Sequence, residues 1–384
     1  MTFSSMETYL SLNKSFDVAI VGGGVIGLSL ARALRKRGVE RVCVIESKAE
    51  LGTEASWAAG GMLAPQSEAN EADAFFQLCS ASLKLYTQFV EELLEETRID
   101  AQLERTGTLY LAFTERDVEE IEKRYEWQRR AGLRVEKLTA VEAREIEPFI
   151  SEKVLAALRF PLDVQVENRL LVNALIASCE KIRTDFFTNA RVESLLIESG
   201  RVIGVETSRG NIEAKKIVIA CGAWVSLLKV SDNNHKPVGV EPVRGQMLSF
   251  ASKERIFKHV IYSPRGYIVT RVDGRILAGS TSEYVGFEKS VTLEGVHTIT
   301  TNALEIAPSL ARLQLVDSWS GLRPRSADEM PIIGALSKIE GLYYAAGHFR
   351  NGILLAPITA DTLADEIMRS ARSPLLEPFS PDRF

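Results

Sequence analysis

The sequence contains only four cysteines among its 384 residues. They are Cys43, Cys79, Cys179 and Cys221, and no two of them stand in a C-x-x-C pair. This scatter argues against a dense disulfide framework and against a zinc ribbon. We therefore expect reduced thiols that pack as small apolar side chains.

Histidine is as scarce as cysteine. The four histidines are His235, His259, His297 and His348. None of them stands at the spacing of a metal-ligand pair, so we expect the protein to bind no metal.

Long apolar runs and an excess of positive charge are also absent. Nothing in the sequence approaches about 18 consecutive apolar residues, the length of a membrane-spanning helix. The segment from Met1 to Ser15 lacks the basic region and apolar core of a signal peptide. The net charge is −5, so a general phosphate-neutralising surface is missing. We expect a soluble, cytoplasmic protein that binds neither membranes nor nucleic acid.

Near its start the sequence has a strand, a glycine-rich turn and a helix in that order. Phe16 to Val21 is mostly apolar and β-prone, and the turn Gly22 to Gly27 leads into a helical stretch. Gly22 permits the turn, Gly24 lets the backbone approach a pyrophosphate, and Gly27 lets helix and strand pack closely. Free N–H groups at the helix start bind the anion. The pattern predicts a dinucleotide site, and a glycine-rich turn that only packs is the alternative.

A second apolar strand, Arg41 to Ile45, ends at a carboxylate, Glu46. An acid at this position accepts hydrogen bonds from an adenosine ribose and would repel the extra phosphate of NADP. The following segments leave the short β-α steps of an NAD dehydrogenase, since 72–96 and 117–130 both read as helices. Apolar strands that end in glycine return at 216–222 and 341–347.

The remaining segments predict smaller features. Residues 189–198 and 201–207 form a hairpin around Ser199-Gly200, and Thr139 to Glu142 is a capping box that opens a short helix. Strands around 246–250, 267–272 and 275–278 suggest an antiparallel sheet.

Several motifs together carry a specific resemblance. They are Val21 to Gly27, Trp57 to Pro65, Gly321 to Pro324 and Ala345 to Pro357. On these motifs the chain resembles the glycine oxidases of the thiazole-synthesis type (ThiO), within the D-amino-acid oxidase and sarcosine oxidase group of FAD enzymes. The resemblance extends from Phe16 to Phe384.

The resemblance implies an α/β fold in which a Rossmann-type FAD-binding domain is interleaved with an α+β substrate domain that contains an antiparallel sheet. With 46% hydrophobic residues the chain is long enough for two cores. We expect the FAD-binding domain at 14–70, 150–230 and 325–370, and the substrate domain at 71–149 and 231–324. Residues 1–13 and 371–384 are expected to be N- and C-terminal tails.

The cofactor implied is FAD, held without a covalent bond because no cysteine follows Cys221, whereas relatives that tether it use a cysteine near the C-terminal flavin strand. The residues expected around it are Gly22, Gly24, Val25, Ile26, Gly27, Glu46, Ser47, Ala55, Ser56, Gly60, Gly61, Met62, Val192, Gly222, His348, Phe349, Arg350, Asn351, Gly352, Ile353 and Leu354. A helix that starts near Gly352 would stabilise negative charge on the reduced flavin.

Three residues are expected at the catalytic centre. The planar fork of Arg323 suits a substrate carboxylate, and its apolar setting disfavours a surface arginine. By the resemblance, Tyr267 also binds that carboxylate and Arg350 lies beside flavin and substrate. The alternatives are a core tyrosine at position 267 and a phosphate contact or surface ion pair at position 350.

The activity implied is oxidative deamination of glycine, with sarcosine and small D-amino acids as further candidates. Hydride transfer to flavin would release an imine that hydrolyses to glyoxylate and ammonia, or that supplies thiazole synthesis with a link to thiazole synthase. Reoxidation by O2 would give hydrogen peroxide. By alignment, Arg265 and Ser282 replace a pocket histidine and a pocket methionine, which leaves the preferred amine open. A homo-oligomer is compatible with the sequence.

Three other functions stay open at this point. A D-amino-acid dehydrogenase that passes electrons to a quinone would share the flavin motifs. A tRNA-modifying relative is disfavoured by the acidic net charge. A non-catalytic flavoprotein would require a vestigial pocket around Arg323.

Overall fold

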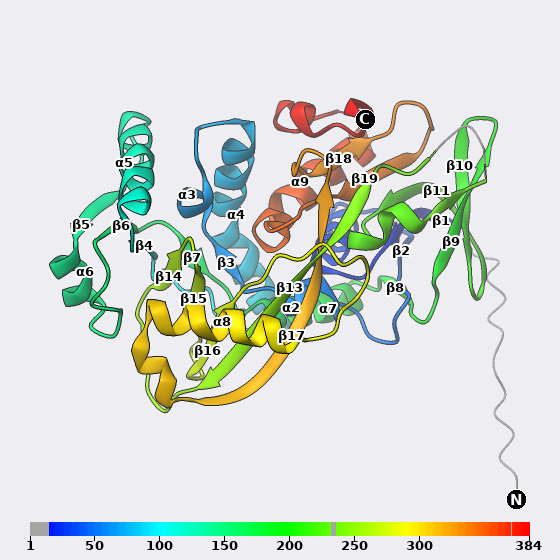
Figure 1. Ribbon diagram of the computed structural model, residues 1–384. Coiled ribbons are helices and arrows are strands. Elements are labelled where there is room, and N and C mark those ends of the chain that lie inside the picture. Colours follow the sequence, from blue (N-terminus) through cyan, green and yellow to red (C-terminus); the bar gives the residue numbers. More distant parts are fainter. Residues whose placement is uncertain (1–14, 232–235, 370) are drawn as a thin grey trace, which may run out of the picture.

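The computed structural model describes residues 15–231, 236–369 and 371–384. Within these ranges the chain forms a nine-stranded sheet, an eight-stranded sheet and a two-stranded one, with helices packed around them (Figure 1). The expected α/β class is confirmed. The tail expected at 1–13 and the residue His235 lie outside the described residues.

The nine-stranded sheet is built around a parallel centre. Its strands are β1 (Phe16–Val21), β2 (Val42–Ile45), β8 (Asp185–Phe187), β9 (Val192–Glu198), β10 (Arg201–Thr207), β11 (Gly210–Ile219), β12 (Lys229–Val230), β18 (Ile332–Ala335) and β19 (Leu342–Ala346). The order β19-β11-β1-β2-β8 is parallel throughout. The antiparallel hairpin β9-β10 extends the sheet from β11, with its turn where the sequence predicted it.

Both faces of the parallel centre are covered, which is why its strands are nearly continuous apolar runs. Alternate residues of β1 show this, because Val18 and Ile20 belong to a core shared with helices, and Ala19 and Val21 to a core shared with the hairpin. The helices are α1 (Val25–Lys36), α4 (Ala74–Thr97), α7 (Asn168–Lys181) and α9 (Gly352–Arg369). A 3-10 helix, η1 (Gly222–Leu227), joins the hairpin on the second face.

The eight-stranded sheet is antiparallel except where β14 meets β4. Its strands, in spatial order, are β17 (Gln314–Ser326), β13 (Val240–Ala251), β16 (Arg275–Gly279), β15 (Gly266–Thr270), β14 (Val260–Ser263), β4 (Thr108–Ala112), β6 (Ala156–Phe160) and β5 (Glu136–Thr139). Helix α8 (Leu293–Ile306) packs on one face, through Ile299 and Ala303. The opposite face carries Met247, Tyr267 and Trp319 in a separate cluster.

The remaining elements lie between or after the strands and helices named above. They are α2 (Ala55–Ala58), α3 (Pro65–Glu68), α5 (Glu115–Arg130), α6 (Ala140–Ile146), η2 (Pro308–Arg312), η3 (Pro374–Phe379), η4 (Pro381–Arg383) and the two-stranded sheet β3 (Met62–Leu63) with β7 (Val164–Gln165). The predicted capping box is present at α6, where Thr139 accepts from the backbone N–H of Glu142 at 3.3 Å.

Three segments pack with a different sheet or core from the one that the expected division into domains assigns to them. Helix α4, expected in the substrate domain, packs with α9 and α7 in the core of the first sheet. Strand β6, expected in the FAD-binding domain, pairs with β4 and β5 in the second sheet. The expected C-terminal tail buries Leu376 and Phe379 in the first core. A periodic apolar stripe shows that an element buries one face, but not which partner it finds.

The thiols behave as expected. Cys43, Cys79 and Cys179 are buried, and all four cysteines are free. Burial raises the pKa of Cys179 and of Cys221 to about 12, which keeps both thiols protonated. No helix in the described ranges is both long and apolar enough to span a membrane.

Candidate active site

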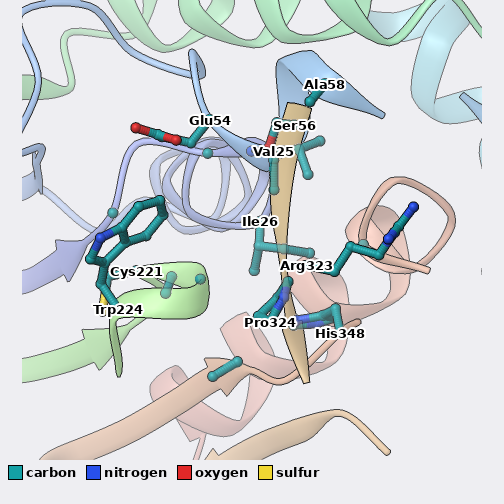
Figure 2. Close-up of a pocket in the computed structure, with 18 of the residues that line it drawn as sticks. Val25, Ile26, Glu54, Ser56, Ala58, Cys221, Trp224, Arg323, Pro324 and His348 are labelled. Carbon is teal, nitrogen blue, oxygen red and sulfur yellow. Dashed lines mark hydrogen bonds between the residues drawn. The ribbon is translucent and has the colours of Figure 1, made fainter. Parts of the chain in front are cut away.

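A cavity of about 980 Å³ is lined by residues from both large sheets. At its middle, Val25 and Ile26 at the start of α1 lie between Trp224 on one side and Arg323 on the other (Figure 2). We call one end the nucleotide end, lined by Gly22, Gly24, Glu46, Ser47 and Val192, and the other the substrate end, lined by Glu68, Met247, Tyr267, Arg323 and Arg350.

The turn at the nucleotide end requires glycine for steric reasons. Gly22 has a φ of +117°, in the region that side chains rarely adopt, and a Cβ there would overlap the backbone of Ala220. A Cβ on Gly27 would overlap the carbonyl oxygen of Gly22. Gly27 therefore packs helix α1 against the turn and does not line the cavity, whereas Gly24 does line it.

Polar side chains hold this turn in place. The Gly23 N–H donates to Glu46 Oε2 at 2.9 Å, and the Val25 N–H donates to Ser56 Oγ at 2.9 Å. Glu46 Oε1 also accepts from the Ser47 hydroxyl and the Lys48 N–H, both at 2.9 Å. Glu46 thus orders the turn as well as lining the place where a ribose would lie.

A second helix start meets the cavity at α9. Asn351, Gly352 and Ile353 line the cavity, and the first turn of a helix leaves backbone N–H groups without an intrahelical partner. His348 lies just before this helix, 4% exposed, with Nε2 at 3.1 Å from Thr359 Oγ1. Burial lowers the pKa of His348 to about 3, so the ring is neutral at physiological pH.

The glycine turn after α2 is held by a buried arginine that the sequence analysis did not single out. Arg271 is 2% exposed, and its guanidinium donates to the carbonyl of Gly60 at 2.9 Å and to that of Val166 at 2.7 Å. Its Nε lies 3.3 Å from Glu167 Oε2. Arg271, which does not itself line the cavity, therefore fixes the backbone of the cavity-lining segment Gly60 to Met62.

Arg323 lies on β17 with its guanidinium over the neighbouring strand β13. A Cβ on Gly245 would overlap that guanidinium, so the glycine provides its place. Arg323 Nη1 donates to the carbonyl of Thr281 at 3.1 Å and Nη2 to the hydroxyl of Ser280 at 2.7 Å. Burial lowers the pKa of Arg323 while Tyr267 acts in the opposite direction, and a guanidinium stays charged in either case.

A row of tyrosines crosses the inner face of the second sheet. Tyr267 pairs in register with Tyr262, and Tyr262 with Tyr110. The rings of Tyr262 and Tyr267 stack with centroids 6.4 Å apart. The Tyr267 hydroxyl donates to Met247 Sδ at 3.0 Å, and its ring packs against Gly60. Tyr267 is thus at the substrate end and is also a packed core side chain.

Arg350 reaches the same end from the segment before α9. Its Nη2 donates to the Tyr262 hydroxyl at 2.7 Å and lies 3.6 Å from Glu68 Oε1 on α3. Glu68 is the largest cause of the raised pKa of Arg350. Burial raises the pKa of Tyr262 to about 12, so this hydroxyl keeps its proton.

Two residues expected in the pocket are not there. The Arg265 guanidinium points to Asp117 and Glu305, at 3.3 and 2.7 Å, and covers the ring of Phe113, because these acids compensate its charge away from the cavity. Ser282 is exposed and does not line the cavity. The expectation that these two positions shape the substrate pocket was wrong.

Most residues expected around the cofactor line the cavity. The exceptions are Gly27, which packs, and Leu354, which is 1% exposed and whose carbonyl accepts from Ser82. The lining residues that were not expected include Glu68, Trp224, Gly245, Met247 and Ser280. The available signal was that Glu68 is the first charged residue after Gly60.

The residues present fit FAD. A cavity of about 980 Å³ is large enough for a dinucleotide, and it presents the starts of two helices to an anionic ligand. Glycines leave the backbone accessible to a ligand at both helix starts and at the Gly60-Gly61 turn before Met62. Among the described residues, no cluster of metal-ligating side chains was found.

Comparison with known proteins gives consistent results. Residues 17–366 match the family described as FAD dependent oxidoreductase (DAO). A glycine oxidase from Pseudomonas aeruginosa is 34% identical over 366 residues, covering 94% of this chain and 96% of the relative. The crystal structure of glycine oxidase from Geobacillus kaustophilus superposes with a TM-score of 0.91 at 33% identity, covering 96% of this chain and 99% of that one.

Some relatives are longer than this chain. The bifunctional protein ThiO/ThiG of Trichormus variabilis is 34% identical over 381 residues, which are 96% of this chain but 55% of the relative. The chain therefore spans about half the length of the bifunctional relatives. With a family match across 17–366 and a cavity that fits the cofactor, the chain belongs to the FAD dependent oxidoreductase (DAO) family, and FAD is its cofactor.

Proposed function

We propose that this protein oxidatively deaminates glycine with FAD, and that sarcosine and small D-amino acids are further substrates. The products would be the imine or glyoxylate, ammonia and hydrogen peroxide. One observation carries this proposal. The Arg323 guanidinium is held at the end of an FAD-sized cavity beside Tyr267, where a small carboxylate can bind. The similarity to glycine oxidases supports the oxidase over a quinone-linked dehydrogenase.

Arg323 is the anchor of the substrate in this proposal. Its two hydrogen bonds to Ser280 and Thr281 fix the plane of the guanidinium before substrate arrives, so little side-chain entropy is lost on binding. A planar donor fork binds both oxygens of a carboxylate, and the Tyr267 hydroxyl can donate to one of them after leaving Met247. The carboxylate is thereby oriented with the α-carbon toward the middle of the cavity.

FAD, when bound, supplies the two-electron acceptor for the hydride that leaves the α-carbon. The chain supplies orientation, a water-poor pocket and electrostatic stabilisation. The start of α9 at Asn351 and Gly352 offers backbone N–H groups to negative charge that develops on the flavin ring. His348, which is neutral, adds no charge there.

The substrate amine reacts in its neutral form, and no side chain is assigned as an obligatory base. At the substrate end the positive charges of Arg323 and Arg350 exceed the negative charge of Glu68 by one, which disfavours an ammonium group there. The flavin is held without a covalent bond. Cys221 is the one cysteine among the cavity-lining residues described, it belongs to the nucleotide end beside Gly22, and its thiol stays protonated.

A role in making the thiazole of thiamine follows from the relatives that join ThiO to ThiG. We propose that the imine formed here feeds a thiazole synthase acting as a separate partner. A homo-oligomer and a cytoplasmic location remain part of this proposal.

Anaerobic reduction tests the proposed function directly. Glycine added to the purified yellow protein without oxygen should bleach the flavin absorption band, and readmitted air should restore it with release of hydrogen peroxide. A band that glycine never bleaches, while a small D-amino acid does, would contradict glycine as the substrate.

A further inference from the structure

The substrate end of the cavity has a charge arrangement that is not explained by binding one carboxylate. Arg323 and Arg350 both reach it, and Glu68 lies beside Arg350. Glu68 also acts on the pKa of Arg323 and of Tyr262, so its charge is felt across the whole end. One arginine is enough for a substrate carboxylate, and the second is compensated by an acid of the protein.

Glu68 is held in this place by the fold. It ends the short helix α3, whose first N–H groups, from Gln66 and Ser67, donate to the carboxylate of Asp163 at 3.3 and 3.2 Å. Asp163 is fully buried, and the Gln66 amide donates to the buried Gln128 at 2.9 Å. The backbone that carries Glu68 is therefore fixed by hydrogen bonds, and its carboxylate lines the cavity from this fixed position.

The contact between Glu68 and Arg350 leaves the guanidinium available. At 3.6 Å the pair is an ion pair rather than a hydrogen bond, and the Arg350 hydrogen bond that the structure shows goes to Tyr262 at 2.7 Å. The Glu68 side chain is 20% exposed and that of Arg350 46%, both where they line the cavity. Without the Glu68 charge, Arg350 would be a free cation facing the substrate.

We propose that Glu68 is a specificity-determining residue, which restricts the site to amino acids with a single carboxylate by compensating the charge of Arg350. This inference rests on the proposed function. Arg323, Arg350 and Glu68 together carry a net charge of +1, which one substrate carboxylate balances. A second carboxylate would approach Arg350 only by also approaching Glu68, and such like-charge contact selects against it.

Ligand binding to the holoenzyme tests this without turnover. Acetate and malonate, which carry one and two carboxylates, are titrated while the perturbation of the flavin absorption band is followed. The wild-type protein should bind acetate more tightly than malonate. In Glu68→Gln the affinity for malonate should rise by roughly tenfold, while that for acetate changes by less than about threefold.

Turnover should follow the same rule. The ratio of kcat/KM for iminodiacetate to that for glycine should rise roughly tenfold in Glu68→Gln, mainly through a lower KM for iminodiacetate. In an Arg350→Gln background the same Glu68 substitution should change the ratio and the malonate affinity by less than about threefold, because no free cation is released and only the repulsion by Glu68 is removed. Glu305→Gln is the matched control, since Glu305 pairs with Arg265 outside the cavity.

Several results would overturn the proposal. Malonate binding to the wild type as tightly as acetate overturns the proposal, even if the Glu68 variant fails to hold FAD. So does a malonate affinity unchanged by Glu68→Gln, a gain of equal size in Glu305→Gln, or a gain that is undiminished without Arg350. If glycine does not bleach the wild-type flavin, the proposed function fails separately, and the anion titrations still report on Glu68.

Discussion

At the nucleotide end of the cavity the glycine turn offers backbone groups from one short segment, beside Glu46, Ser47 and Val192. At the substrate end the chain offers charged and aromatic side chains from separate elements. Gly22 to Gly27 form the first within a single strand-turn-helix unit. The second is assembled from α3, β13, β15, β17 and the segment before α9. Backbone recognition needs glycines at fixed local spacing, and side-chain recognition needs the register of a whole sheet.

The two ends also differ in how they are held. The glycine turn is fixed by close contact with backbone, as at Gly22 against Ala220, as well as by its hydrogen bonds to Glu46 and Ser56. Arg323 is fixed by hydrogen bonds and by the space left at Gly245. A substitution at the first end should therefore disturb the fold together with cofactor binding, and one at the second should disturb catalysis alone.

The largest effect is expected from Gly22→Ala. A Cβ there overlaps the backbone of Ala220, and the positive φ of Gly22 adds backbone strain. We expect the free energy of unfolding to fall by on the order of 4 kcal/mol and FAD to be lost. Gly38→Ala is the control, because Gly38 also has a positive φ but nothing lies within 4 Å of its Cβ. That variant should lose about 1–2 kcal/mol. Equal losses in urea unfolding would contradict the role of the contact.

Arg323→Ala should come next. Loss of a charge-assisted contact to the substrate should lower kcat/KM for glycine, mainly through a higher KM, while FAD stays bound. The loss corresponds to about 2–5 kcal/mol of binding free energy. Arg325→Ala, on the same strand, removes ion pairs with the exposed acids Glu241 and Glu329 and should change kcat/KM by less than about 1 kcal/mol. Unchanged glycine kinetics in Arg323→Ala would remove this residue from the site.

A pH-dependent effect of intermediate size is expected at His348. An unfolded histidine binds its proton near pH 6.5, and burial lowers the pKa of His348 to about 3. Between these values the unfolded chain binds more protons, so the free energy of unfolding falls as pH falls, by up to about 1.4 kcal/mol per pH unit. Above pH 6.5 this group leaves stability unchanged.

His348→Gln removes this titration and can keep a hydrogen bond to Thr359. Urea unfolding at fixed FAD concentration should show a stability loss between pH 6.5 and pH 5 that is about 2 kcal/mol larger for wild type than for the variant. Parallel pH profiles for the two proteins would show that folding does not lower the pKa of His348.

The smallest effect is expected at an ion pair between the loop before α2 and the loop before α8. Lys289 Nζ lies 2.7 Å from Glu54 Oε2, and both side chains are partly exposed. Lys289→Ala should weaken FAD binding by about 0.5 kcal/mol, roughly twofold in Kd, and high salt should abolish the difference. A much larger loss would mean that side chains, and not the backbone cradle alone, retain the cofactor.

Local patterns predicted the elements well. The Gly22 turn, the hairpin around Ser199-Gly200 and the Thr139 capping box each depend on a few neighbouring residues, and each is present. The division into domains was less accurate. Helix α4 and strand β6 were assigned by their position along the chain, yet each packs with the other layer.

The substrate end could be predicted only by resemblance. Arg323 and Tyr267 were expected there and line it, but Arg265, two residues before Tyr267, turns to Asp117 and Glu305. Nothing in the spacing of Arg265 shows this, because the acids that compensate it lie on helices distant in sequence. Arg271 was missed for the same reason, since its partners come from loops far away along the chain.

By itself, the sequence determined the strand-turn-helix at the nucleotide end, the alternation of strands, and the presence of an arginine suited to a carboxylate, because these depend on local sterics and residue chemistry. The tertiary structure decided which charges meet. Glu68, Tyr262 and Arg350 are separated widely in the sequence and become neighbours only through the packing of α3, β14 and the start of α9. Charge compensation acts through space over a few ångströms, so only the folded chain defines the substrate end.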